Sequence, residues 1–408
     1  MIEKLYKESN YINKIKAISN NTCHRCLSKN LYKDDYGIIH CLDCYNYHKI
    51  DSTMFLYRYI NTKQRKTHIL KLEYELNNNQ VKGSNFFVDC LKNKTYGFLQ
   101  AVCGAGKTEI TLNVVLEALN KFYTICFVTP RVEVLKEVAN RYKSHFPKTC
   151  IKTLYAENKD YHNADIIFST PQQLINFYQE FDLIILDEVD AFPYLNNIKL
   201  ERLVKKSLKK TGIILYMSAT IDETLAKKIQ EEGIKFYTIV SRYHLINLPV
   251  PKLLRINNLL HLNTIIIKIL KEKIELDKSV IVFVPTIKYG DSLKDLLYKN
   301  NIFSKTISSK TVYKKQLIKA FKRKEFQVLI STTILERGVT FKDIDCIVCS
   351  AEHRVFSKES LIQISGRVNR VKDFQNGEAI FIYEHISKPI KKCIKEIKLM
   401  NRLNQSEM

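Results

Sequence analysis

At 408 residues the chain has room for roughly two or three domains that each bury a core. Its 65 Lys and Arg against 42 Asp and Glu leave a formal net charge of +23, which favours a polyanionic partner, a nucleic acid before an anionic membrane surface. No apolar run is long enough to cross a bilayer, and residues 1–20 lack the apolar core of a signal peptide, so we expect a cytoplasmic protein rather than a secreted or membrane-embedded one.

The first predicted element is a zinc ribbon. CHRC at 23–26 and CLDC at 41–44 are two Cys-x-x-Cys pairs separated by a short hairpin that contains Lys, Asp and Gly. Four thiolates in this pattern converge tetrahedrally on one zinc ion, and a shell closed by four protein ligands indicates a structural site. The predicted ligands are Cys23, Cys26, Cys41 and Cys44. A further pair, CIVC at 346–349, lies in an apolar run without a partner pair and is not predicted to bind metal.

The segment that follows the second pair, CYNYHKIDSTMFLYRYI at 44–60, interleaves tyrosines with basic residues. Tyr57 and Tyr59 alternate with Arg58 and are predicted to group with it on one strand face, and aromatic rings beside guanidinium groups can stack unpaired bases. The alternative is that these tyrosines form the small core beside the zinc.

From about residue 75 the chain alternates short apolar runs with helix-like segments rich in Leu, Lys and Glu. The runs GFLQAV, YTICFVT, ADIIFST, FDLIILD and GIILYMSAT predict a parallel sheet with helices on both faces. After LPVPKLL at 248–254, the runs KSVIVFVPT, FQVLIST, DIDCIVCSA and GEAIFIY predict a second such sheet. The expected fold class is therefore α/β, with two parallel-sheet lobes and a crevice between them, preceded by the ribbon. The predicted boundaries are 1–70 for the ribbon, 71–245 and 246–386 for the lobes, and 387–408 for a basic C-terminal helix.

A phosphate-binding loop follows the first of these strands. AVCGAGKTEI at 101–110 opens the predicted helix TEITLNVVLEALN, which is the context that such a loop requires. Backbone N–H groups at a helix N-terminus would cradle the phosphates, Lys107 would reach the β and γ oxygens, and the Thr108 hydroxyl would ligate Mg²⁺. The nucleotide contacts predicted here are Gly104, Ala105, Gly106, Lys107, Thr108 and Glu109.

A pair of carboxylates follows the strand FDLII. In LDEVD at 186–190, Asp187 would hold Mg²⁺, and Glu188 would orient and deprotonate the attacking water. A small-molecule kinase excludes water, so this pair favours hydrolysis. The alternative is a charged turn that caps the next helix.

The second lobe carries QISGRVNR at 363–370, in which Arg367 and Arg370 are spaced i, i+3 and are predicted to share one helix face. Two guanidinium groups there would bind the γ-phosphate across the crevice. MSAT at 217–220 places the hydroxyls of Ser218 and Thr220 at a strand end, where they suit a relay between the ATP site and the polymer.

Taken together, GAGKTE, DEVDAFPY, SAT, TTILERGVTF and QISGRVNR resemble the motifs of superfamily-two helicases. With the ribbon and the linker RYHLINLPVP at 242–251, the chain more narrowly resembles the ComFA family of competence ATPases. The resemblance implies RecA-like lobes that bind ATP, Mg²⁺ and Zn²⁺. It also implies ATP-driven translocation of single-stranded DNA during DNA uptake, at the inner face of the cell membrane.

Further residues follow from the resemblance by position. The implied nucleic-acid contacts are Thr129, Arg131, Thr170, Gln173, Thr286 and Thr332, and the implied coupling residues are Ser218, Ala219, Thr220 and Gln363. Gln80 would read the adenine edge, and Glu336 to Gly338 would face the nucleotide. The family's last motif usually reads G-R-x-G-R, and Asn369 replaces its second glycine here. We expect the loop to tolerate this change because Asn accepts unusual backbone angles.

The partners implied by the resemblance are single-stranded DNA, the ComEC membrane channel and a ComFC-like protein, with membrane association through these partners and homo-oligomerisation left open. The C-terminal segment 387–404 places Ile390, Cys393, Ile394 and Ile397 on one stripe, which would lie on lipid or pack on its own domain. Two other functions stay open. One is a helicase acting on duplex DNA or RNA, and the other is a zinc-containing clamp that binds nucleic acid without moving.

Overall fold

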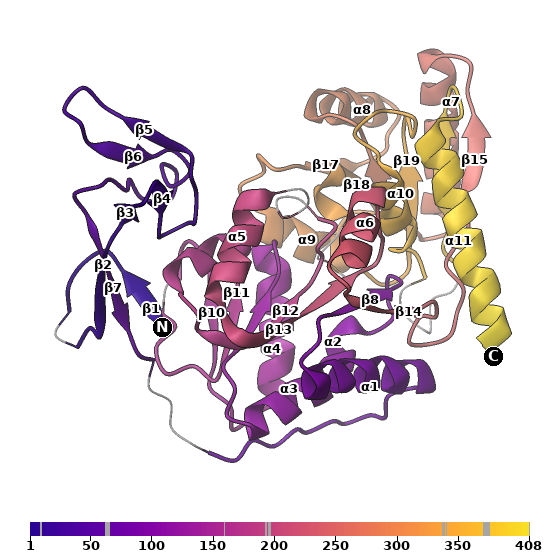
Figure 1. The fold of residues 1–408 in the computed structure, drawn as a ribbon. Coiled ribbons are helices and arrows are strands. Elements are labelled where there is room, and N and C mark those ends of the chain that lie inside the picture. The colour runs from indigo at the N-terminus through magenta and orange to yellow at the C-terminus, as the bar shows by residue number, and fades with distance from the viewer. Residues whose placement is uncertain are drawn as a thin grey trace. The chain divides into compact units, whose positions relative to one another are not determined.

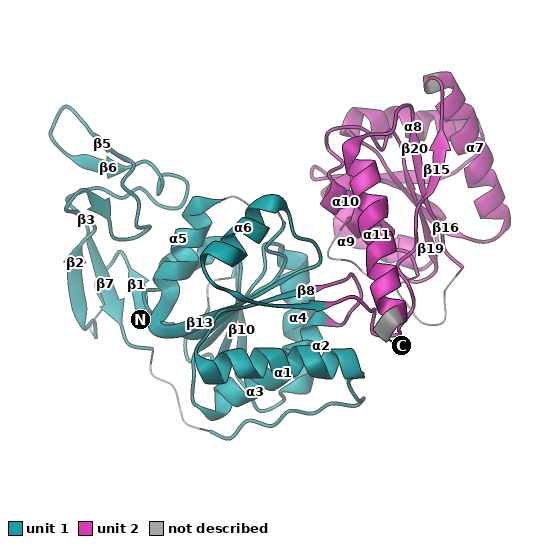
Figure 2. Cartoon of the chain, turned by 45° about the vertical axis from the view of Figure 1, so that its right-hand side comes forward, with its two compact units in different colours: residues 1–100, 107–238 teal, residues 101–106, 239–408 magenta. Residues whose placement is uncertain are grey.

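A computed structural model describes residues 1–8, 10–61, 66–158, 160–191, 194, 197–336, 339, 341–369 and 376–407. The chain divides into two compact units (Figure 2). Unit 1 contains residues 1–100 and 107–238, and unit 2 contains residues 101–106 and 239–408. The phosphate loop at 101–106 therefore has its contacts with unit 2, although the strand before it belongs to the sheet of unit 1. The domain boundaries predicted from the sequence stay predictions.

The N-terminal part of unit 1 consists of short antiparallel strands (Figure 1). Strands β1 (Ile2–Lys4), β7 (Phe55–Tyr59) and β2 (Asn13–Lys16) form one sheet in that order. Two hairpins carry the cysteine pairs, one from β3 (Ile18–Ser19) and β4 (Thr22–Cys23) and one from β5 (Leu31–Lys33) and β6 (Ile39–Cys41). Strands this short bury little apolar surface among themselves.

The rest of unit 1 is built on a seven-stranded sheet in the order β10-β11-β9-β12-β13-β8-β14. The strands are β8 (Gly97–Ala101), β9 (Ile125–Val128), β10 (Ile151–Leu154), β11 (Ile166–Ser169), β12 (Phe181–Leu186), β13 (Leu208–Ser218) and β14 (Lys235–Ile239). The helical segments are α1 (Asn78–Asn93), α2 (Lys107–Ile110), α3 (Leu112–Asn120), α4 (Val132–His145), η1 (Pro171–Asn176), α5 (Ile198–Ser207) and α6 (Glu223–Glu231). The pairings from β10 through to β8 are parallel, and β9 is buried at all four positions, as expected for a strand covered on both faces.

The sequence predicts one helix after the phosphate loop, and this prediction is wrong at Thr111. The helical segment there divides into α2 and α3, with Thr111 between them. The buried Thr111 hydroxyl donates to the Thr108 carbonyl at 2.6 Å and also contacts the Tyr142 hydroxyl. A side chain that bonds to the preceding turn competes with the regular helix pattern.

Unit 2 is built on a six-stranded sheet in the order β15-β20-β19-β16-β18-β17, with parallel pairings throughout. The strands are β15 (Lys252–Arg255), β16 (Ser279–Phe283), β17 (Ser304–Ile307), β18 (Val328–Ser331), β19 (Ile344–Val348) and β20 (Ala379–Tyr383). The helical segments are α7 (Leu259–Glu275), α8 (Ile287–Lys299), α9 (Lys314–Lys322), η2 (Thr333–Leu335), α10 (Lys358–Ser365) and α11 (Lys388–Glu407). Two parallel α/β sheets with an N-terminal four-cysteine cluster confirm the predicted fold class.

Helix α11 packs on its own unit. Ile390, Cys393 and Ile397 are buried, and α11 lies against α10. The Asn401 side chain donates to the carbonyl oxygen of Leu248 at 2.8 Å and accepts from its N–H at 2.8 Å. The predicted apolar stripe is therefore a packing surface. No helix within the described parts of the chain is long and apolar enough to span a bilayer.

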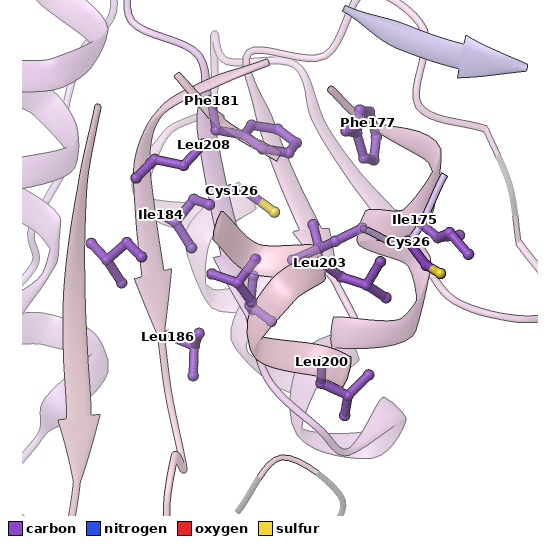
Figure 3. Close-up of a cluster of buried hydrophobic side chains, with 14 of the residues drawn as sticks. Cys26, Cys126, Ile175, Phe177, Phe181, Ile184, Leu186, Leu200, Leu203 and Leu208 are labelled. Atoms are coloured by element: carbon purple, nitrogen blue, oxygen red, sulfur yellow. The ribbon is translucent and has the colours of Figure 1, made fainter. Parts of the chain in front are cut away.

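The core of unit 1 continues into the ribbon. Figure 3 shows Phe177, Phe181 and Leu203 among the side chains of one buried cluster, with Cys26 beside Ile175. Helix α5 packs in this cluster together with Cys26, so the N-terminal part of the chain shares a core with the sheet of unit 1.

Candidate functional site

The four predicted zinc ligands come together. Their sulfur atoms all lie within 4.8 Å of one another, and all four cysteines are buried. The Sγ atoms of Cys23 and Cys44 are 3.8 Å apart, and those of Cys26 and Cys41 are 3.5 Å apart. A tetrahedral zinc with bonds of about 2.3 Å requires sulfur–sulfur distances of about 3.8 Å. The geometry therefore fits one structural zinc ion, with Cys23, Cys26, Cys41 and Cys44 closing its shell.

We expect the purified chain to release one zinc ion when its thiols are titrated with an organomercurial. Cys41→Ser should abolish that release and unfold the ribbon, because structural zinc contributes on the order of 10 kcal/mol to small domains. Cys150→Ser is the matched control, since Cys150 is a half-buried cysteine outside the cluster. Full zinc content in the Cys41 variant would refute the assignment.

The phosphate loop has the backbone conformation that its glycines permit. Gly104 has φ +88° and Gly106 has φ +80°, both in the left-handed region that disfavours side chains. Lys107 begins α2 directly after the loop, so the loop's N–H groups lie at the start of a helical segment. Glu109 accepts from Arg141 at 3.2 Å, which ties α2 to α4.

Asp187 and Glu188 directly follow the end of β12. Asp187 is 8% exposed, and burial raises its pKa to about 6 against the opposing effect of the Lys107 ammonium. Mg²⁺ would therefore compete with a proton for this carboxylate below about pH 6. Glu188 has φ +54°, and its N–H donates to Asp187 Oδ1 at 2.9 Å. A non-glycine residue in the left-handed region costs about 1 kcal/mol or more, and such strain concentrates at functional sites.

The implied polymer contacts of unit 1 follow neighbouring strands. Thr129 follows β9 and Thr170 follows β11, and parallel strands bring their carboxyl ends to one edge of the sheet. Both threonines are buried, and no partner is found for the Thr129 hydroxyl within the described structure. Gln173 lies on η1 and accepts from Asn176 at 3.3 Å. Arg131, the fourth implied contact, has its Nε atom 3.9 Å from a Glu188 carboxylate oxygen.

The predicted coupling segment, residues 218–220, lies at the carboxyl end of β13, at the same edge of the sheet as Thr129 and Thr170. Ser218 Oγ donates to the Thr220 carbonyl at 2.7 Å, and the Thr220 hydroxyl donates to the Asp190 carboxylate. Ala219 stands buried between the two. The segment is thus hydrogen-bonded to the loop that carries Asp187 and Glu188.

In unit 2, Thr286 and Thr332 follow β16 and β18, which are neighbouring parallel strands. Thr286 is the N-cap of α8, where its hydroxyl accepts from the Tyr289 N–H at 3.1 Å. A helix N-terminus is also a favourable place for a phosphate. The arrangement is compatible with the implied backbone grip.

The prediction that Arg367 lies on a helix face is wrong. Helix α10 ends at Ser365, and Arg367 stands in the turn after it. Gly366 packs so closely on Cys103 that an added Cβ would lie 2.7 Å from the Cys103 Cβ. Arg367 is 3% exposed and donates to the carbonyls of Glu336, at 3.1 Å, and Val339. Gln363, on α10, accepts from the Cys103 thiol at 2.9 Å.

Arg242 is a residue that sequence reasoning missed. It is 1% exposed, and its guanidinium donates to the carbonyls of Val368, at 2.9 Å, and Asn369. Its side-chain carbons lie 3.6 to 3.7 Å from the position that a Gly104 Cβ would take. Arg242 thus connects the phosphate loop with the turn after α10. The available signal was its place at the start of RYHLINLPVP, a segment that marked the family resemblance.

Asn369 adopts φ +54°, which explains how it can replace a glycine. Its side chain accepts from the Gly377 N–H at 2.8 Å.

We expect Asn369→Gly to keep ATP turnover near the wild-type rate and Asn369→Val to lower thermal stability by about 1–3 kcal/mol, because a β-branched residue is strained at this φ. Turnover assays and thermal unfolding of both variants check this, and a fully stable Val variant would contradict it.

The Gln80 side chain, predicted to read the adenine edge, caps a helix in the structure. Gln80 is the N3 residue of α1, where its side-chain oxygen accepts from the Asn77 N–H at 3.0 Å, so that oxygen serves a capping box. Arg370 and Gly338 lie outside the described residues, as do two residues of DEVDAFPY.

The proposed grouping of Tyr57, Tyr59 and Arg58 on one face is wrong. Arg58 points to the opposite side of β7 and is buried, with its Nε 3.0 Å from Glu3. Tyr59 is 7% exposed and belongs to the core, which the sequence left open as the alternative.

Two family models match the chain. Residues 66–223 match the type III restriction enzyme res subunit, and residues 261–372 match the helicase conserved C-terminal domain. Competence protein ComFA of Streptococcus pneumoniae (strain ATCC BAA-255 / R6) is 36% identical over 93% of this chain and 90% of its own length. The chain belongs to the ComFA family of competence proteins. ComFA of Bacillus subtilis (strain 168) is 29% identical over 90% of this chain and 81% of its own length.

The solved structures agree with the fold. S. cerevisiae Dbp5 bound to RNA and ADP BeF3 matches with a TM-score of 0.57 and 18% identity, over 80% of this chain and 92% of that chain. This likeness concerns the fold alone. The chain is a superfamily-two helicase ATPase with two RecA-like units and a four-cysteine cluster.

Proposed function

We propose that this chain is an ATP-driven translocase of single-stranded DNA that serves DNA uptake. The observation that carries the proposal is the placement of Asp187 and the strained Glu188 at the end of β12, with the Lys107 ammonium acting on Asp187. The competence role is supported by the names of the two ComFA relatives. The net charge of +23 supports a polyanionic partner.

The proposed chemistry is hydrolysis of ATP. The loop N–H groups and Lys107 bind and orient the phosphates, and Thr108 with Asp187 would hold Mg²⁺. When bound, Mg²⁺ neutralises the charge that develops on the phosphate oxygens. Glu188 orients the water and accepts its proton as the new P–O bond forms and the bond to the ADP oxygen breaks. Arg367 and Arg370 stay the proposed contacts of the γ-phosphate.

The proposed track for DNA is a set of polar side chains at, or just after, the carboxyl ends of the strands. Its proposed members are Thr129, Arg131, Thr170 and Gln173 in unit 1, and Thr286 and Thr332 in unit 2. Gripping the sugar-phosphate backbone would let the chain move along DNA without reading sequence. From the family resemblance, a membrane channel of the ComEC type and a ComFC-like protein are the proposed partners at the membrane.

ATP turnover measured with no nucleic acid, single-stranded DNA, duplex DNA and RNA tests the proposal. We expect single-stranded DNA to stimulate turnover most. Turnover that ignores nucleic acid, or responds only to RNA, would refute it. Strand separation of a tailed duplex without a preference for single-stranded DNA would favour the helicase alternative instead.

A further inference from the structure

One face of the N-terminal sheet gathers aromatic and basic side chains. Phe55 and Tyr57 share it because residues two apart in a strand point to the same side. On β2, Lys14 is the register partner of Tyr57 and Lys16 is the partner of Phe55, so both lysines belong to the same face. Together with Tyr11, which packs on Tyr57, these residues form what we call the aromatic-lysine face.

The aromatic-lysine face is accessible. Lys14 and Lys16 are exposed, and Tyr11, Phe55 and Tyr57 are half-buried. Strand β2 is an edge strand of its sheet, and Figures 1 and 2 show it at the outer side of unit 1. The face is therefore open to a ligand in solution.

Cations already lie over its rings. The Lys14 ammonium is 4.0 Å from the centroid of the Phe55 ring and 5.9 Å from that of Tyr57, and the Lys7 ammonium is 5.5 Å from that of Tyr11. Tyr11 meets Tyr57 edge-on, with centroids 5.3 Å apart. Lysine ammonium groups thus lie over these rings on the accessible side, while Tyr11 and Tyr57 also pack against the core of unit 1. Phosphates could draw the ammonium groups away and leave the rings to bases.

The opposite face of the same sheet has a different role. Leu56 is fully buried there, and Arg58 forms its ion pair with Glu3. On the side of the aromatic-lysine face, Tyr59 is in the core at 7% exposure, whereas Phe55 and Tyr57 are half-buried, so only the part of that face at Phe55 and Tyr57 is accessible.

We propose that the aromatic-lysine face is a second contact for single-stranded nucleic acid, separate from the strand ends of the two sheets. Bases would stack on Phe55 and Tyr57 while phosphates bind Lys14 and Lys16. Two features favour this ligand over a protein partner. The lysines attract the phosphates of a polyanion, and the accessible rings can stack unpaired bases. The inference rests on the function proposed above. In it, the N-terminal sheet binds the strand while the two RecA-like units hydrolyse ATP and move it.

The test measures the Kd of the zinc-loaded 408-residue chain for a fluorescent oligothymidylate at several salt concentrations. The first variant, Phe55→Leu with Tyr57→Leu, removes the rings and keeps apolar volume. The second, Lys14→Gln with Lys16→Gln, removes two charges without touching the core. The control, Lys33→Gln with Tyr36→Leu, changes a lysine and a tyrosine that is 92% exposed on the β5–β6 hairpin. Zinc content verifies that each variant is folded.

We expect the ring variant to raise Kd about tenfold or more, since stacking on an aromatic side chain contributes about 1–3 kcal/mol per base. The lysine variant should flatten the slope of log Kd against log salt by about 1.4, or about 0.7 for each lost phosphate contact. The control should bind like wild type. Unchanged affinity and slope in both variants would overturn the inference, even where single-stranded DNA still stimulates wild-type turnover. Wild-type turnover that ignores single-stranded DNA would instead refute the proposed function.

Discussion

Glu188→Gln should lower DNA-stimulated ATP turnover by about 10²- to 10⁴-fold, the usual contribution of a positioned general base. Gln keeps the size of the side chain and the strained backbone at φ +54°, but it cannot accept the proton of the attacking water. ATP binding should persist, because the loop and Lys107 are unchanged. Steady-state turnover and binding of a fluorescent ATP analogue measure the two effects separately.

The matched control is Glu201→Gln. Glu201 lies on α5 in the same unit, where its carboxylate pairs with Lys228 at 2.7 Å. It should turn over ATP at the wild-type rate. If the Glu188 variant hydrolysed ATP as fast as this control, Glu188 would not be the base, and the positive φ would need another explanation.

Glu3→Gln should destabilise unit 1 by about 3–5 kcal/mol, because it leaves buried cations without their counter-charge. Glu3 accepts from Lys206 Nζ at 2.7 Å and from Arg58 Nε at 3.0 Å, and the Lys206 side chain is fully buried. Burial lowers the pKa of Lys206, which shows that its environment already disfavours the charge. Lys206 also donates to the carbonyls of Arg25 and Ile175, so the same ammonium connects the turn between Cys23 and Cys26 with η1.

Lys205→Gln provides the comparison. Its pair with Glu232 is 2.9 Å long but exposed, and such pairs contribute about 0–1 kcal/mol. Urea unfolding followed by tyrosine fluorescence suits a chain with 23 Tyr and no Trp. Equal loss of stability in the two variants would show that the buried network contributes no more than a surface pair.

The parts that the sequence predicted well are local. Cys23 and Cys26 are three residues apart, and the four-cysteine cluster that their spacing predicted is present. Asp187 directly follows its strand and the phosphate loop is continuous, so spacing predicted where they lie, while their chemical roles stay predictions. Continuous apolar runs likewise predicted the buried parallel strands. Asn369 shows that a departure from a motif can be understood from backbone preference, since its φ is +54°.

The parts that were missed depend on residues far apart in the chain. Lys206 and Glu3 are separated by 203 positions, and Arg242 and Val368 by 126, so no local pattern relates them. The face of Arg58 depends on which strand pairs with β7. Gly366, directly after the end of α10, packs closely against Cys103, which is distant in the chain. Such features follow from tertiary packing, which overrides local periodicity.

Displacement of streptavidin from a biotinylated oligothymidylate tests the central claim most directly, because only movement along the strand can remove the block. We expect ATP and Mg²⁺ to drive displacement from one end of the strand and not from the other, and Glu188→Gln to abolish it. Displacement at the background rate from both ends, by protein whose ATP turnover single-stranded DNA still stimulates, would contradict the account and leave a clamp in place of a motor.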